Sequence, residues 1–166
     1  MKILLMSDTH RSTTEMENII TRHADEVQLV CHLGDHARDL LKLQQKFPEL
    51  NFVAVAGNCD WEGESARVLD FSPCADSQDA VARILLVHGH QCGVKRGLDR
   101  LAYATKEAGA IAAFYGHTHL PIVTTHADIF IMNPGSPSFP RGGSKASYGI
   151  AEISPEGEIS GRIFPV

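Results

Sequence analysis

Short apolar runs alternate with polar segments along the first two thirds of this chain. Five such runs stand out, and each is followed by a cluster that contains Asp, Asn or His. The runs are residues 2–7, 27–33, 51–56, 83–87 and 110–115. Runs of this length that are rich in Val, Ile and Leu are typical of buried strands. We therefore expect five buried strands, each with a polar loop after it.

Segments with helical periodicity lie between several of these runs. Residues 16–23 follow the 3.6-residue period, after a pattern typical of a capping box at Ser12–Glu15. Residues 40–47 predict a second helix. A third is predicted over 94–108, with Gly109 as its stop. Alternation of strands with helices indicates a parallel sheet with crossover helices.

The pattern changes after residue 120. Segments 121–126, 128–132, 147–154 and 158–164 resemble strands joined by short turns, which indicates an antiparallel part. The fold class expected from these patterns is α/β (α+β), with two sheets packed together. A length of 166 residues suits one domain, and no linker divides the chain, so residues 1–166 are expected to form it.

Composition limits the cellular location and the classes of partner that we expect for this protein. A net charge of −5 argues against a general nucleic-acid binder, which would normally present a basic face. No apolar run approaches the roughly 20 residues of a membrane span. The N-terminal "MKILLM" meets Asp8 too early for a signal peptide. Cys31, Cys59, Cys74 and Cys92 form no C-x-x-C pair, so we expect free thiols and a cytoplasmic protein without membrane partners.

The polar clusters predict a metal centre. In parallel α/β sheets the loops at the carboxyl ends of the strands line the ligand crevice, so side chains far apart in the sequence can meet there. Seven candidates share this placement: Asp8, His10, Asp35, Asn58, His88, His117 and His119. Their nitrogen and oxygen atoms suit Mn, Fe, Ni or Zn. Seven ligands exceed the need of one ion that also binds water, which favours two ions sharing a carboxylate, as in phosphoryl-transfer hydrolases.

The motifs "SDTH", "LGD", "GNCD", "HGH" and "GHTH", in this order, resemble the series found in calcineurin-like metallophosphoesterases. "MNPGSPSFPR" and "ASYGIAEI" resemble the compact bacterial and archaeal phosphodiesterase subfamily that includes YfcE and is related to the retromer subunit Vps29. The resemblance runs from residue 1 to about residue 153. It implies a four-layer αββα sandwich of two mixed β-sheets flanked by helices.

The resemblance also implies roles for the seven candidates. The first metal would be held by Asp8, His10 and His119, the second by Asn58, His88 and His117, and both by Asp35 as a bridge. Asn58 and His117 would in addition take part in catalysis. The implied reaction is hydrolysis of a phosphoester by a metal-activated hydroxide at a dinuclear centre. Mn is the expected cofactor, with Ni, Fe or Zn as alternatives.

Five further residues have weaker assignments. Cys59 stands where the broader family has His, and two interpretations stay open: a small buried filler, which we favour, or a weak proton donor. Asp60 is expected to orient its neighbours without touching substrate. His90 and His36 could face the substrate or only support the centre. Arg141 could clamp a phosphate oxygen, although we favour a solvated loop arginine.

Three functions are open from the sequence. We favour a metal-dependent phosphodiesterase acting on a small phosphodiester. A phosphomonoesterase or nucleotidase with the same site is the first alternative, and a Vps29-like protein-binding scaffold is the second. The basic residues Lys95, Arg96, Arg100 and Lys106 are assigned to the solvated face of the third helix. The resemblance further implies a homo-oligomer, as a dimer or tetramer.

Overall fold

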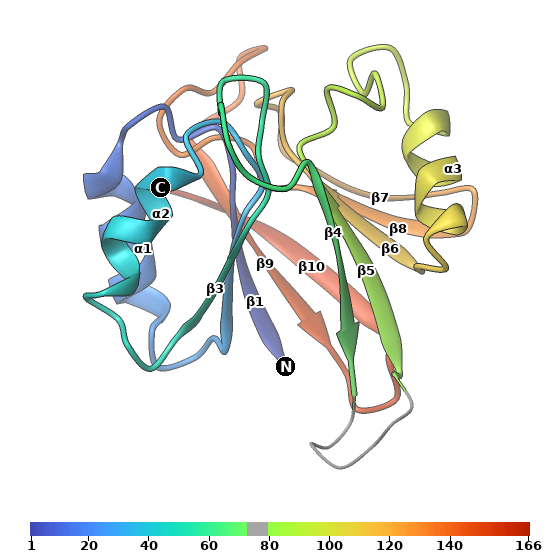
Figure 1. The fold of residues 1–166 in the computed structure, drawn as a ribbon, viewed down its shortest axis with the longest axis horizontal. Coiled ribbons are helices and arrows are strands. Elements are labelled where there is room, and N and C mark those ends of the chain that lie inside the picture. Colours follow the sequence, from blue (N-terminus) through green and yellow to red (C-terminus); the bar gives the residue numbers. More distant parts are fainter. Residues whose placement is uncertain (73–79) are drawn as a thin grey trace.

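The computed structural model describes residues 1–72 and 80–166 (Figure 1). Its helices are α1 (Thr13–His23), α2 (Arg38–Gln44) and α3 (Asp99–Glu107). Its strands are β1 (Lys2–Met6), β2 (Leu29–His32), β3 (Asn51–Ala54), β4 (Ala66–Phe71), β5 (Ala82–Val87), β6 (Ala112–Tyr115), β7 (Ile122–His126), β8 (Ile129–Asn133), β9 (Ser147–Ile153) and β10 (Ile159–Pro165). All nine strands expected from the sequence are present.

The strands form two mixed sheets. The first has five strands in the order β10-β9-β1-β2-β3, and the second has five in the order β4-β5-β6-β8-β7. In the first sheet β1, β2 and β3 run parallel, and β9 returns antiparallel to β1. In the second sheet β5, β6 and β8 run parallel, while β4 and β7 are antiparallel edge strands. The carboxyl ends of β1, β2, β3, β5 and β6 therefore carry the predicted polar loops.

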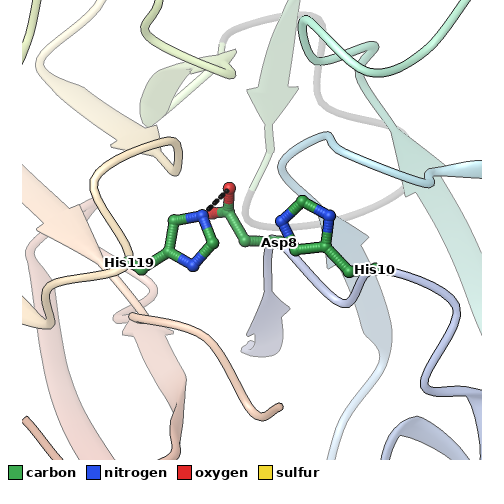
Figure 2. A group of neighbouring side chains, drawn as sticks. All are labelled: Asp8, His10 and His119. Atoms are coloured by element: carbon green, nitrogen blue, oxygen red, sulfur yellow. Dashed lines mark ion pairs between the residues drawn. The ribbon is translucent and has the colours of Figure 1, made fainter. Parts of the chain in front are cut away.

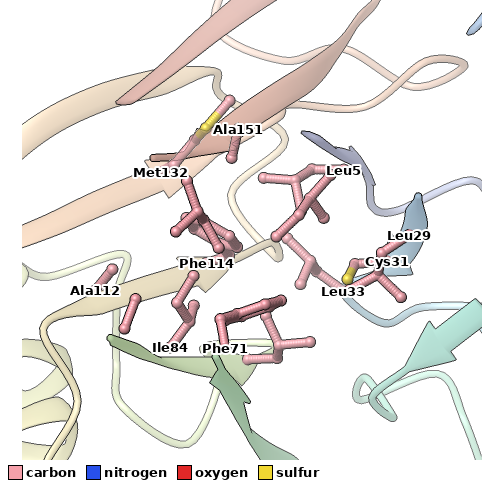
Figure 3. Packing of buried hydrophobic residues seen from close by; sticks show 14 of the residues in the cluster. Leu5, Leu29, Cys31, Leu33, Phe71, Ile84, Ala112, Phe114, Met132 and Ala151 are labelled. Carbon is pink, nitrogen blue, oxygen red and sulfur yellow. The ribbon is translucent and has the colours of Figure 1, made fainter. Parts of the chain in front are cut away.

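Three apolar clusters hold four layers together. The central cluster lies between the sheets, where Leu5 and Leu33 of the first face Phe114 and Met132 of the second (Figure 3). A second cluster packs α1 and α2 on the outer face of the first sheet, and a third packs α3 on the second sheet. Figure 1 shows the same arrangement, with α1 and α2 on one side of the sheets and α3 on the other. The expected αββα sandwich is confirmed.

Several local expectations need correction. Strand β4 was missed, because only Phe71 at its end is buried and the strand lies at a sheet edge. The third helix begins at Asp99 and not at residue 94. Ser12 precedes α1, but its hydroxyl bonds the Glu15 carboxylate and caps no backbone N–H, so the capping box is wrong in its hydrogen bonds. Gly109 follows α3 with φ of +65°, as its stop role requires.

Two expectations drawn from the composition, free thiols and no membrane span, can be compared with the structure. Cys31, Cys59 and Cys92 carry free thiols, whereas Cys74 lies outside the described residues. Within residues 1–72 and 80–166, no helix combines the length and the apolar character that a bilayer crossing would need.

Candidate metal centre

The five polar loops meet at one end of the two sheets, at the top of Figure 1. Their backbone is strained there. Asp8, His10, Asp35, His117 and His119 all have positive φ angles, between 45° and 67°. The left-handed region costs a non-glycine residue roughly 1–3 kcal/mol and persists only where the surrounding structure enforces it. Strain in five predicted ligands marks this end of the sandwich as the candidate functional site.

The first cluster consists of Asp8, His10 and His119 (Figure 2). One ligand atom from each lies within 4.8 Å of the others. His119 Nε2 is 3.2 Å from Asp8 Oδ1. The rings of His10 and His119 are stacked with centroids 5.2 Å apart. His119 Nδ1 donates a hydrogen bond of 2.6 Å to the carbonyl oxygen of Phe139, which leaves Nε2 to face the carboxylate.

The second cluster lies around His88, which is fully buried. Its Nδ1 donates to the carbonyl oxygen of Leu33 at 2.7 Å, since a carbonyl can only accept. Its Nε2 lies 3.4 Å from Asp35 Oδ1 and 3.2 Å from Asn58 Oδ1. It also lies 4.0 Å from Asp8 Oδ1, so Asp8 and Asp35 stand between the two groups of imidazoles.

The carboxylate oxygens of this site have too few protons or positive charges around them. Asp8 Oδ1 is buried and has no hydrogen-bond partner in the described part of the chain. The Nδ1–H groups of His88 and His119 donate to backbone carbonyls. Each Nε2 atom faces oxygen atoms that can only accept hydrogen bonds, so a proton or a cation is needed between the nitrogen and these oxygens. Burial is the largest single influence on the pKa of Asp8 and raises it, but His119, His88 and Ser7 together outweigh burial and the pKa is lowered. The donor set of carboxylates, imidazoles and an amide oxygen therefore fits divalent cations.

Burial lowers the pKa of His119, but its close contact with the Asp8 carboxylate raises it, with a net rise. Burial is the main cause of the lowered pKa of His10. In His117, burial and the charges of His88 and Lys95 lower the pKa to about 4. His10 and His117 are therefore neutral at pH 7, as metal ligands must be.

His117 is placed differently from the other candidates. Its backbone N–H donates to Asp8 Oδ2 at 2.9 Å, which fixes the carboxylate. Its ring stands beside the cluster, with its centroid 5.0 Å from that of His88 and 6.0 Å from that of His90. Among the described residues, the three His/Cys/Asp/Glu groups compact enough to hold a metal do not include the His117 ring.

Cys59 contacts the predicted bridge. Its N–H donates to Asp35 Oδ1 at 2.9 Å and its Sγ lies 3.3 Å from Asp35 Oδ2. The residue is exposed, so it is not a buried filler. Partial desolvation of the thiol raises its pKa, and the hydrogen bond and charge of Asp35 raise it further, to about 11. The thiol therefore keeps its proton at pH 7, and it also forms a compact group with His10 and Asp35.

Asp60 joins two loops of the site. Its carboxylate accepts hydrogen bonds from Gly57 N at 2.8 Å and from Ala37 N at 3.1 Å. The loop that carries Asn58 is thereby tied to the loop that carries Asp35. This placement suits a positioning residue.

The remaining candidates surround the centre. The ring of His36 lies 5.4 Å from that of His10, and the ring of His90 lies 5.4 Å from that of His88, measured between centroids. Arg141 is exposed and lines a hollow of about 310 Å³ together with His10, His119, Phe139 and Pro140. The structure thus brings His36 and His90 against metal-ligand candidates and leaves Arg141 on the rim.

Sequence reasoning missed residues that hold the first loop in place. Ser7 Oγ donates to Asp8 Oδ2 at 2.7 Å, and Ser136 Oγ donates to the carbonyl oxygen of Asp8 at 2.8 Å. His32 is fully buried and forms a hydrogen bond of 3.0 Å with Thr9 Oγ1. A histidine inside a buried parallel strand, directly before "LGD", was the available signal for His32. Ser136 lies in the motif "MNPGSPSFPR", but its contact with Asp8 had no local signal, because the two residues are 128 positions apart.

Comparisons with known proteins agree with this geometry. Residues 1–156 match the model of the calcineurin-like phosphoesterase superfamily domain. The chain is 33% identical to the probable metallophosphoesterase YsnB of Bacillus subtilis, over 92% of this chain and 85% of the relative. It is also 33% identical to the phosphodiesterase YfcE of Escherichia coli, over 92% of this chain and 88% of the relative.

A solved structure extends the likeness of the fold. Wild-type Vps29 of Entamoeba histolytica in complex with Zn²⁺ superposes with a TM-score of 0.74 at 19% identity, over 99% of this chain and 98% of that chain. The family match and the two bacterial relatives are stronger evidence of descent than this shared shape. The chain belongs to the calcineurin-like phosphoesterase superfamily.

Proposed function

We propose that this chain is a metal-dependent phosphodiesterase whose site holds two divalent metal ions. One observation carries the proposal: the buried Asp8 carboxylate and the Nε2 atoms of His88 and His119 face one another without enough protons to satisfy them. Two cations would neutralise this arrangement. The presence of YfcE, a phosphodiesterase, among the relatives supports the substrate class.

The assignment of ligands follows the two clusters. Asp8, His10 and His119 would hold one ion, and Asn58, His88 and His117 the other, with Asp35 between them. Asp8 also contacts both clusters, so it supports the bridge. His117 is proposed for the second group because its ring stands beside that of His88.

Mn is the ion we propose, with Ni, Fe or Zn as alternatives. Mixed nitrogen and oxygen ligands suit all four, and selectivity then depends on geometry and availability. The ions would supply positive charge for the phosphoryl oxygens and lower the pKa of water toward about 7. Chain residues supply the rest of the chemistry.

The side chain of Asn58 is oriented with its oxygen toward the proposed second ion. Its Nδ2 donates to Cys59 Sγ at 3.4 Å, which turns Oδ1 toward His88 and the second cluster. His117, neutral at pH 7, can donate a hydrogen bond to a phosphoryl oxygen from the open side of the cluster. Cys59 carries a proton that it could give to a leaving alkoxide, although its high pKa makes this transfer slow. Good leaving groups, such as aryl oxides, should therefore react fastest.

His36, His90 and Arg141 are proposed to contact the two ester substituents. His36 and Arg141 flank His10 and His119, and His90 lies on the opposite side beside His88. A bound diester would therefore have one substituent on each side of the centre. A cytoplasmic location, supported by the free thiols, and a dimeric or tetrameric state remain predictions.

The test compares an aryl phosphodiester with the matching monoester. The protein is stripped with chelator and reloaded with Mn, and Asn58→Ala and His117→Ala are assayed beside the wild type. We expect diester cleavage that requires metal and falls by at least about 100-fold in both variants. Lys46→Ala, at a residue that follows α2 and pairs with Glu17, is the control and should keep full activity.

Other outcomes would redirect the assignment. Faster cleavage of the monoester would favour the phosphomonoesterase or nucleotidase alternative. Absence of both turnover and bound metal would favour a protein-binding scaffold, the alternative suggested by the Vps29 fold. Activity that survives in both variants would contradict the assigned site.

A further inference from the structure

A basic hollow adjoins the metal centre. It has a volume of about 550 Å³ and is lined by His90, Gln91, Cys92, Gly93, Lys95, Arg96, Gly97, Asp99, Arg100 and His117. His90 and His117 form its inner end, because their rings stand beside His88 of the second cluster. The hollow therefore opens directly onto the place where the phosphoryl group would bind.

Three exposed cations line the outer part: Lys95, Arg96 and Arg100. None of them forms an ion pair with an acidic side chain in the described part of the chain. The single acid of the lining, Asp99, is paired with His126 at 2.8 Å. The hollow thus has three cations against one acid, a local excess of positive charge beside the metal centre of a chain whose net charge is −5.

The loop that carries Lys95 and Arg96 is anchored, and Arg100 lies in the first turn of α3. Val94 is buried in the cluster under α3, and Arg96 N donates to the carbonyl oxygen of Gly93 at 2.8 Å. Lys95 and Arg96 precede α3, whose first residue is Asp99, so they are not spread along a solvated helix face as the sequence suggested. Lys95 and His117 line the same hollow. The backbone that carries Lys95 and Arg96 is therefore held beside the centre.

We propose that the basic hollow is a specificity subsite for an anionic group, a carboxylate or phosphate, carried by one of the two ester substituents of the substrate. The opposite hollow beside Phe139 and Pro140 has apolar lining residues and one cation, Arg141, and suits the other substituent. The preferred substrate is then an unsymmetrical diester with an additional negative charge. This inference rests on the proposed phosphodiesterase function and narrows it.

The test measures binding, so that it does not depend on turnover. Mn-loaded protein is titrated by calorimetry with 2-carboxyethyl phosphate and with propyl phosphate, which differ in a carboxylate replacing a methyl group. We expect the carboxylate compound to bind the wild type about tenfold more tightly, since three partly exposed ion pairs each add a small gain. This ratio should decrease at high salt.

Two triple variants decide the origin of the preference. Lys95→Gln/Arg96→Gln/Arg100→Gln should bring the affinity ratio close to 1. The matched control, Arg22→Gln/Lys106→Gln/Arg162→Gln, removes the same charge from outside the hollow and should keep the ratio of the wild type. Equal affinities in the wild type, or a preference that persists in the first variant, would overturn the subsite.

The failure of the proposed function would look different. In that case neither phosphate compound would bind in the presence of Mn, and no aryl diester would be hydrolysed. That result would reject the metal centre and this subsite together. Turnover of an aryl diester without any preference for the carboxylate compound would reject the subsite alone.

Discussion

Replacing Gly116 with alanine should destabilise the protein by about 2–4 kcal/mol and weaken its metal site. Gly116 lies between β6 and His117, and it has no room for a side chain. A Cβ built there would lie 1.9 Å from Ser7 Oγ, 2.8 Å from Asp8 Oδ2 and 2.9 Å from Ser7 Cβ. The Ser7 hydroxyl would have to move by more than 1 Å, which breaks its 2.7 Å hydrogen bond to Asp8.

A double-mutant cycle with Ser7→Ala tests this reasoning. Overpacking costs roughly 1–3 kcal/mol, and the loss of a hydrogen bond to a charged group costs about 1.5–3 kcal/mol. Ser7→Ala alone loses the bond but also removes the atom nearest to the new methyl group. The double variant should therefore be at least about 1 kcal/mol more stable than the sum of the single effects predicts.

The assay is urea unfolding in chelator, followed by far-ultraviolet circular dichroism. Fluorescence of Trp61 is unsuitable for unfolding, because this side chain is already 99% exposed in the folded protein. Gly93→Ala with Ser7→Ala is the control cycle, since a Cβ at Gly93 meets nothing within 4 Å. The control should be additive within about 0.5 kcal/mol. Additivity in the Gly116 cycle as well would refute the predicted overlap.

Three further predictions concern the core, His119 and Cys59. Phe114→Ala should lower the free energy of unfolding, measured in urea, by about 3–5 kcal/mol. Ile111, which is 47% exposed, is the control, and an equal loss of stability in Ile111→Ala would contradict the assigned core. Burial lowers and Asp8 raises the pKa of His119, with a net rise above 6.5. The metal-free protein should thus lose stability as pH increases through that raised pKa, and His119→Gln should flatten this part of the curve; an unchanged curve would argue against the contact. With a thiol pKa of about 11, Cys59 should react slowly with iodoacetamide at pH 7.5, and the rate of alkylation should keep increasing up to pH 10. A rate that stops increasing below pH 9 would disprove the contact with Asp35.

The layout of the site was predictable because it depends on local patterns. Each ligand candidate follows an apolar run, which is largely buried in β1, β2, β5 and β6 and only partly buried in the edge strand β3, and parallel strands place their carboxyl ends at the same edge. Asp8 after β1 and Asp35 after β2 meet for this reason. The sequence could not show which sheet each strand joins, and the return of β9 beside β1 depends on contacts between distant residues.

Other features had no local signal. Strand β4 is mostly exposed at an edge, so its residues lack the apolar pattern of a buried strand. The serine side chains that fix the first loop come from a segment far along the chain: Ser136 and Ser138 bond the backbone of Asp8 and Thr9. The cations of the basic hollow are local in the sequence, but only the fold places them beside His117.

The number and position of bound Mn ions test the proposed centre most directly. Protein saturated with Mn is freed of excess metal, its ions are counted by mass spectrometry, and crystals are examined by anomalous diffraction at the Mn edge. We expect two ions per chain, one among Asp8, His10 and His119 and one among Asp35, Asn58 and His88. One ion or none at saturation, or ions bound away from these side chains, would contradict a dinuclear phosphodiesterase.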